Sequence, residues 1–137
     1  MSHNQPRISL EYSRICKEVI QKSPYEFVFT EIIASFKPRQ YPFTLTYKLV
    51  NCWRLDHKTH LERVSLHVPT SATYQDFDLL TEEIPNKEQL GAERYISTLP
   101  LDNLIFKTDC LLVFRTFLDG ELVISLQLPV VLLPLGN

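Results

Sequence analysis

Glycine is scarce in this sequence, with three glycines among 137 residues against nine prolines. Three isolated glycines provide no loop that could cradle a phosphate group, and there is no Gly-x-Ser-x-Gly nucleophile elbow. The prolines divide the chain into segments of strand length, which leaves little room for helices. These absences argue against phosphate-binding loops and hydrolase elbows, and they favour a protein built from strands.

The sequence also lacks an excess of charge of one sign and a long apolar run. Fourteen basic and 16 acidic residues give a net charge of -2, so no cationic field would attract nucleic acid or anionic lipid. The most apolar stretch, residues 122–135, is interrupted by Gln127, Pro129 and Pro134, and the N-terminal residues have no apolar core of signal-peptide length. We therefore expect no nucleic-acid partner, no membrane span and no secretion.

Cysteine occurs three times, at Cys16, Cys52 and Cys110. This odd number and wide spacing suit neither a disulfide framework nor a zinc site made from paired cysteines. We expect all three to be small buried apolar side chains, where free cysteine is most often found. Unpaired thiols favour a cytoplasmic location.

The chain does contain alternating apolar and polar residues, the pattern of strands with one buried face. Strands are predicted over residues 8–20, 25–36, 43–53 and 61–68, the last two joined as a hairpin by residues 55–60. In the last of these strands the apolar side is assigned to Leu61, Val64, Leu66 and Val68.

The length of the chain is that of one ordinary domain, and 45% of its residues are hydrophobic. Asn86 precedes helix-forming residues and predicts a short helix within an exposed connection over residues 86–94. The sequence therefore predicts a single domain over residues 1–137. Its expected fold is all-β, a two-sheet antiparallel β-sandwich, Ig-like or similar, with at most one short helix.

The C-terminal hairpin is the most informative pattern, because two apolar segments flank Asp119 and Gly120. The alternation of apolar and polar residues in the two strands favours a three-residue loop over residues 118–120, with Gly120 in the left-handed conformation. The predicted cross-strand pairs, all on the core face, are Thr116 with Leu122, Phe114 with Ile124, and Leu112 with Leu126.

The opposite face of this hairpin is also apolar, and its apolar residues are Leu111, Val113, Phe117 and Val123. A contiguous apolar face exposed to water is an aggregation hazard, so something should cover it. We predict Val113, Phe117 and Val123 as a possible interface for a protein partner or a second copy of the chain.

Two groups of residues suggest other chemistry. Asp56, His57 and His60, with His67, could bind a metal in a hydrolase, but the His-x-x-His spacing falls on a loop and no cysteine pair completes a tetrahedral set. Trp53 could form a stacking surface for a small ligand or carbohydrate, together with nearby tyrosines. The ordinary alternatives are a solvated loop and a core tryptophan.

Five acidic residues also gather between the predicted strands: Asp76, Asp78, Glu82, Glu83 and Glu88. Paired carboxylates can serve acid–base catalysis, but acids spread over a connecting segment more often keep it soluble. We expect an exposed connection here and no catalytic pair.

Four segments resemble a family of small bacterial β-sandwich domains of unknown function. These segments are ICKEVI at 15–20, FTEIIASF at 29–36, YPFTLTYKLV at 41–50, and LPLDNLIF, LLVFRTFLDGELV and LPVVLL within 99–133. The chain departs from the family in a longer, more acidic insert from Pro69 to Arg94. The resemblance implies a bacterial, cytoplasmic, non-catalytic sandwich and gives no site residues.

The sequence thus favours a non-catalytic protein-interaction or assembly module of a bacterial or phage cytoplasmic system, with no cofactor. A sandwich that binds a small ligand or carbohydrate is one alternative. A metal-dependent hydrolase is another. Fold alone does not decide among these functions.

Overall fold

The computed structural model describes residues 7–23, 26–69, 74–102 and 104–134. Strands make up most of this part of the chain, and its one helix is α1 (Lys87–Leu90). The strands in chain order are β1 (Ser9–Cys16), β2 (Glu18–Ser23), β3 (Glu26–Thr30), β4 (Phe43–Thr44), β5 (Lys48–Arg54), β6 (His60–Pro69), β7 (Tyr74–Ile84), β8 (Arg94–Pro100), β9 (Ile105–Phe106), β10 (Cys110–Leu118) and β11 (Glu121–Val130).

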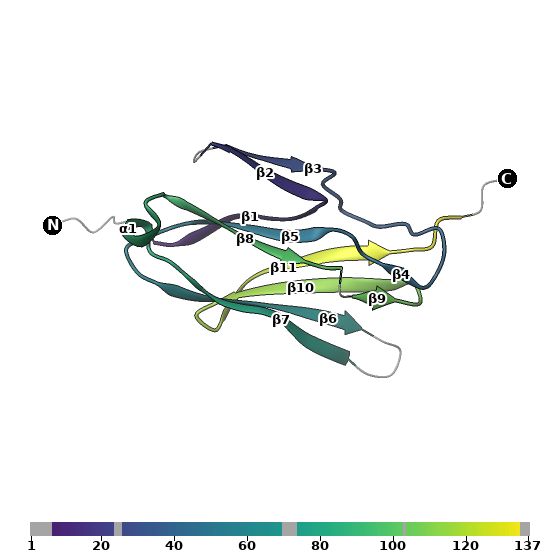
Figure 1. Cartoon of the computed structure of the whole chain (residues 1–137). Helices are drawn as coiled ribbons and strands as arrows, with labels where there is room; N and C mark the ends of the chain where they lie inside the picture. The colour runs from purple at the N-terminus through teal and green to yellow at the C-terminus, as the bar shows by residue number, and fades with distance from the viewer. Residues whose placement is uncertain (1–6, 24–25, 70–73, 103, 135–137) are drawn as a thin grey trace.

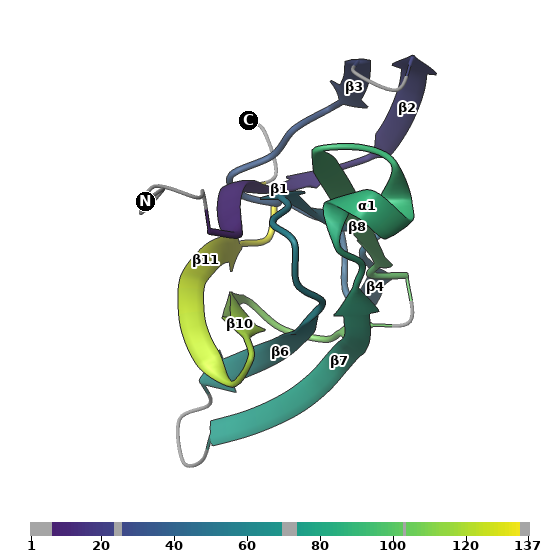
Figure 2. The same ribbon diagram turned by 90° about the vertical axis from the view of Figure 1, so that its left-hand side faces the viewer.

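Two antiparallel sheets form the body of the molecule (Figure 1). One has the strand order β1-β5-β8 and the other β11-β10-β6-β7. In the view of Figure 2 the four-stranded sheet curves below the three-stranded one. Apolar side chains from both sheets meet between them, including Ile15 and Leu49 from one sheet and Leu66, Leu112 and Phe114 from the other. The predicted all-β sandwich with one short helix is confirmed.

Two smaller strand pairs extend the sandwich. The β2–β3 hairpin is separate from the two large sheets, and Phe29 of β3 packs edge-on against Tyr12 of β1. The pair β4–β9 carries Phe43 and Phe106, whose ring centroids lie 5.4 Å apart. The strand predicted over 25–36 is shorter than expected, because β3 ends at Thr30.

The predicted hairpin between residues 43–53 and 61–68 is wrong. β5 pairs with β1 and β8, whereas β6 pairs with β10 and β7, so the chain passes from one sheet to the other between them. The crossing comes after Leu55, which is 3% exposed and whose N–H still donates to the Glu93 carbonyl beside β8.

The predicted exposed connection after residue 69 is also wrong, because β7 occupies most of it and pairs with β6. Asp76, Asp78, Glu82 and Glu83 lie on this strand, and Glu88 lies in α1. A register shift opposite Val64 and Ser65 adds an extra residue to β7 and interrupts its alternation.

The helix predicted after Asn86 is confirmed. The Asn86 side chain accepts a hydrogen bond from the Gln89 N–H, and the Gln89 side chain accepts one from the Asn86 N–H, which completes a capping box. Gly91 ends the helix with a φ of 72°, in the left-handed region where glycine has no Cβ penalty.

The loop of the C-terminal hairpin has two residues, not the predicted three. Leu118 pairs with Glu121, and both Asp119 and Gly120 have positive φ, 51° and 86°. A bulge at Val123 then shifts the register by one residue, so that apolar residues again face the core. The resulting pairs are Thr116 with Ile124, Phe114 with Leu126, and Leu112 with Leu128. The predicted pairs are wrong, and Leu122, expected in the core, is 53% exposed. The left-handed conformation of Gly120 is confirmed.

We expect Gly120→Ala to lower the free energy of unfolding by about 1 kcal/mol, because only the positive φ opposes the new Cβ. No described atom lies within 4 Å of that position. Gly120→Asn is the matched control and should lose less, since asparagine tolerates this conformation better. Chemical denaturation of the two variants checks the difference, and equal losses would contradict it.

Candidate functional site

Four apolar side chains form a surface cluster, the turn-end patch, where the β10–β11 hairpin turns beside the start of β6. They are Leu61, Phe117, Leu122 and Val123. Phe117 lies opposite Leu122 in the register, and the bulge places Val123 next to Leu122. Leu122 is 53% exposed, Leu61 48% and Val123 42%. Side chains expected to pack inward, Leu61 and Leu122, are thus part of an exposed apolar surface.

The structure brings Phe117 and Val123 together in this patch but leaves Val113 out of it. Val113 is buried, with 7% of its surface exposed, so its prediction as an interface residue is wrong. It lies in the interior of the sheet, where its neighbours in the register are His67 on β6 and Gln127 on β11. A small β-branched side chain between two longer side chains is readily covered by them.

Arg63 borders the patch with positive charge. Its guanidinium lies 4.0 Å from the centroid of the Phe117 ring, a cation–π contact, and its Nη1 is 3.0 Å from Asp78 Oδ1 on β7. Phe117 is therefore partly covered, whereas the aliphatic side chains beside it stay open. Aromatic residues and arginine are enriched at protein interfaces, and the Phe117–Arg63 pair provides both.

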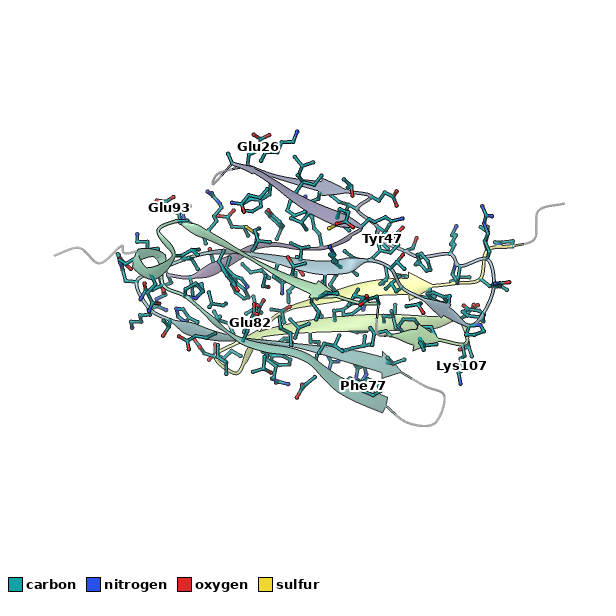
Figure 3. All side chains as sticks on the ribbon, in the orientation of Figure 1. Glu26, Tyr47, Phe77, Glu82, Glu93 and Lys107 are labelled. Atoms are coloured by element: carbon teal, nitrogen blue, oxygen red, sulfur yellow. The ribbon has the colours of Figure 1, made fainter. Side chains whose placement is uncertain are left out.

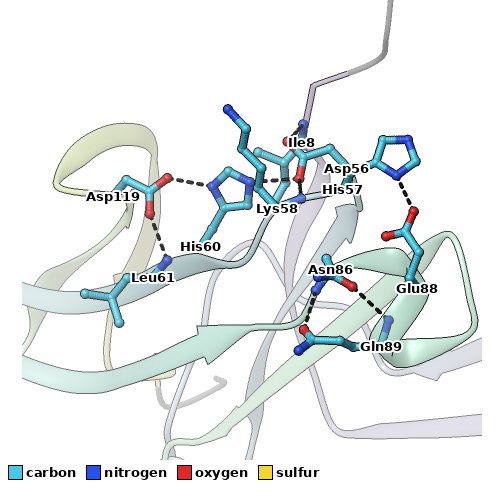
Figure 4. A network of polar contacts seen from close by, with 10 residues as sticks. All are labelled: Ile8, Asp56, His57, Lys58, His60, Leu61, Asn86, Glu88, Gln89 and Asp119. Atoms are coloured by element: carbon cyan, nitrogen blue, oxygen red, sulfur yellow. Dashed lines mark hydrogen bonds and ion pairs between the residues drawn. The ribbon is translucent and has the colours of Figure 1, made fainter.

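His60 links the β10–β11 turn to the loop that follows β5 (Figure 4). His60 Nδ1 lies 2.6 Å from Asp119 Oδ2, and His60 Nε2 lies 2.9 Å from Asp56 Oδ1. The other oxygen of Asp119 accepts a hydrogen bond from the Leu61 N–H at 2.9 Å. We call these residues, Asp56, His60 and Asp119, the His60 clamp. It fixes the turn beside Leu61 and so holds the patch in shape.

Charge strengthens the clamp. Burial alone would lower the pKa of His60, but its hydrogen bonds to Asp119 and Asp56 outweigh burial and raise that pKa. The hydrogen bonds from His60 and the Leu61 N–H lower the pKa of Asp119. Protonated His60 can donate to both carboxylates, whereas neutral imidazole has only one N–H.

Of the predicted metal-binding group, Asp56 and His60 meet but His57 does not join them. His57 pairs instead with Glu88 of α1 (Figure 4). His67 lies farther along β6. Both ring nitrogens of His60 face carboxylates, which leaves neither free for a metal ion. Within the described residues, no group of three or more histidine, cysteine, aspartate or glutamate side chains could hold a metal ion.

Glu62, which the sequence analysis did not select, lies fully buried between the two sheets. Its Oε2 accepts hydrogen bonds from Asn51 Nδ2 at 2.9 Å, Trp53 Nε1 at 2.8 Å and Ser97 Oγ at 2.9 Å. Since these donors lie on β5 and β8, Glu62 is a polar connection from β6 to the opposite sheet.

The second oxygen of Glu62 has no hydrogen-bond partner in the described structure, and neither does Asn51 Oδ1. Burial raises the pKa of Glu62; its three hydrogen bonds oppose this, and the neighbouring Glu82 adds to it. Glu82, on β7 (Figure 3), accepts a hydrogen bond from the Tyr95 hydroxyl. Because its pKa is raised, Glu62 keeps its proton to a higher pH than an exposed glutamate does.

Trp53 lies in the core, as the ordinary alternative predicted. It is fully buried, packs with Leu55 and Ile84, and donates its ring N–H to Glu62. Tyr41 and Tyr47 belong to a different cluster around Phe43 and Phe36. The three rings therefore form no common stacking surface for a ligand.

The prediction of buried, unpaired cysteines holds for two of the three. Cys16 and Cys52 are buried, Cys110 is half-buried, and none forms a disulfide. Burial raises the pKa of each thiol, so none has the lowered pKa of a reactive nucleophile.

Among the residues that the structure describes, no helix has the length and apolar character needed to cross a membrane. The resemblance to small bacterial β-sandwich domains stays a prediction. No protein-family model matches the chain, and no curated protein is significantly similar to it.

Proposed function

We propose that this chain is a non-catalytic protein-interaction or assembly module that associates through the turn-end patch. The observation that carries the proposal is the exposure of Leu61, Leu122 and Val123 around Phe117 at one end of a sheet. Apolar groups gathered in this way gain free energy when a partner removes them from water. Arg63 at the border would add polar contacts at the rim.

The rigidity of the patch supports the same proposal. The two-residue turn, the bulge at Val123 and the His60 clamp each restrict the backbone that carries these side chains. A preorganised surface loses less conformational entropy on binding than a mobile loop does. The three unpaired cysteines support a cytoplasmic setting, as the sequence analysis expected.

The proposal predicts that the double variant Leu122→Ser and Val123→Ser loses association while it stays folded. Both side chains are exposed, so their truncation should change the free energy of unfolding by no more than about 0.5 kcal/mol. Ile105→Ser is the matched control, because Ile105 is 66% exposed and lies on β9, outside the patch.

Sedimentation velocity measures self-association of the three proteins, and affinity capture from the source cells measures binding to another protein. We expect the double variant to lose whichever association the wild type has, and Ile105→Ser to keep it. A monomeric wild type that captures nothing would contradict the proposal, and so would a double variant that binds as the wild type does.

A further inference from the structure

β8 forms one edge of the three-stranded sheet, and the hydrogen bonds at its ends show which backbone groups face outward. The Leu55 N–H donates to the Glu93 carbonyl at 2.7 Å, and the Leu101 N–H donates to the Tyr47 carbonyl at 3.0 Å. Both pairs continue the register of β5 with β8. In an antiparallel ladder every second residue is bonded to its neighbour, so the residues between these pairs alternate.

The alternation directs the backbone groups of Tyr95, Ser97 and Leu99 to β5 and those of Arg94, Ile96 and Thr98 to the open side. In the described structure, no backbone hydrogen bond satisfies these three outward N–H groups. Pro100 follows them and has no N–H, so the open edge ends there. β8 therefore offers a short row of donors and acceptors.

Between Arg94 and Pro100 at its two ends, this edge lacks the features that usually prevent strand pairing. No charged residue occurs between Arg94 and Pro100, and the register with β5 runs without a bulge. The opposite sheet is different, because its edge strand β7 has both a bulge and several acidic residues. Charges and bulges on an edge strand discourage a further strand from pairing with it. β8 is thus the more receptive edge.

A groove of about 420 Å³ runs beside the first half of β8. Its lining includes Arg94, Tyr95 and Ile96 of β8, and the cross-strand pair Gln21 and Phe27 of the β2–β3 hairpin. The rest of the lining comes from the end of α1 and the residues after it, Leu90, Gly91 and Ala92. In Figure 2 the hairpin and α1 both lie on the same side of the molecule as β8.

We propose that this groove binds an extended segment of a partner protein, which pairs with the open edge of β8 as an added strand. Backbone groups at Arg94, Ile96 and Thr98 would form the ladder, and an apolar side chain of the segment would lie between Phe27 and Ile96. The groove has the volume of a small-ligand pocket, which is enough for side chains of one extended segment. The site is separate from the turn-end patch, so either proposal can fail alone.

The test uses a library of random ten-residue peptides, selected for binding to the full chain. We expect the selected peptides to contain a proline-free run with apolar residues at alternate positions. Thr98→Pro removes one outward N–H without removing a bond to β5, and it should weaken their binding by at least about tenfold. Thr98→Ala keeps that N–H and is the matched control, with binding expected to stay within about twofold.

A second variant, Ala92→Trp, fills the groove from outside the strand and should also weaken binding by about tenfold, even if Thr98→Pro fails to fold. In amide NMR spectra, bound peptide should shift Arg94, Ile96 and Thr98. Recovery of no peptide, or equal binding to wild type and Ala92→Trp, would overturn the proposal. Self-association that disappears in Thr98→Pro would also overturn it, in favour of pairing between two copies of β8.

Discussion

Glu62→Ala is expected to lower the free energy of unfolding by about 3 kcal/mol or more. The substitution removes the one acceptor shared by Asn51, Trp53 and Ser97, all of which are buried. The Trp53 and Ser97 donors keep their burial but lose this partner and bear the cost of desolvation, whereas Asn51 Nδ2 keeps a hydrogen bond to Thr116 Oγ1 at 3.0 Å. Urea denaturation at neutral pH, followed by the fluorescence of Trp53, measures the loss.

Glu62→Gln is the matched control, because the amide has the same shape and keeps an oxygen for the three donors. Its NH₂ group would replace the unpaired oxygen of Glu62, in a buried site where Asn51 Oδ1 also lacks a partner. We expect a loss well below that of Glu62→Ala. Equal losses in the two variants would mean that side-chain volume, and not the acceptor, is what the core requires.

The pH dependence tests the protonation of Glu62 separately. Its folded pKa is raised, so its share of stability is complete below its unfolded pKa of about 4.3 and is lost as the pH rises through the folded value. The wild type should therefore lose stability relative to Glu62→Gln between about pH 4 and that higher pKa. A difference between the two proteins that stays constant with pH would show that Glu62 titrates normally.

Alternation predicts the strands well because it is a local property of the chain. It also contained the signal for Glu62, which shares its parity with Val64 and Leu66, both buried. Assigning Leu61 to the core in its place gave weight to residue type over position. A carboxylate in the core is rare unless it is hydrogen-bonded, and its donors lie on strands whose pairing the sequence does not reveal.

Bulges and long-range pairing account for most of the remaining differences. The extra residue at Val123 shifts the alternation of β11 by one position. Phe114 can therefore point into the core even though the turn has only two residues. Strict alternation without a bulge allows either the two-residue turn or the inward Phe114, but not both. Likewise, β5 and β6 are neighbours in sequence, but each lies between two other strands, and only the buried Leu55 hints that the chain crosses the sandwich there.

His60→Ala is expected to lower the free energy of unfolding by about 2 kcal/mol near pH 6. The variant removes two charge-assisted contacts, and the figure is reduced because Asp119 is half exposed to solvent. His57→Ala is the matched control: its pairing with Glu88 is exposed to solvent, so its loss of stability should be much smaller than that of His60→Ala.

The difference in stability between wild type and His60→Ala should depend on pH, and the pKa shifts predict how it changes toward both higher and lower pH. The folded pKa of His60 is raised, so the stability it contributes is complete below its unfolded pKa of about 6.5 and is lost as the pH rises through the folded value. The pKa values of Asp56 and Asp119 are lowered, so their share is present above about pH 4 and is lost as the pH falls through their folded values. The difference between wild type and His60→Ala should therefore be greatest near pH 5 to 6.5 and smaller at pH 9 and pH 2. A difference that keeps one value from pH 5 to pH 9 would mean that His60 packs as a neutral ring and that the clamp holds the turn without charge.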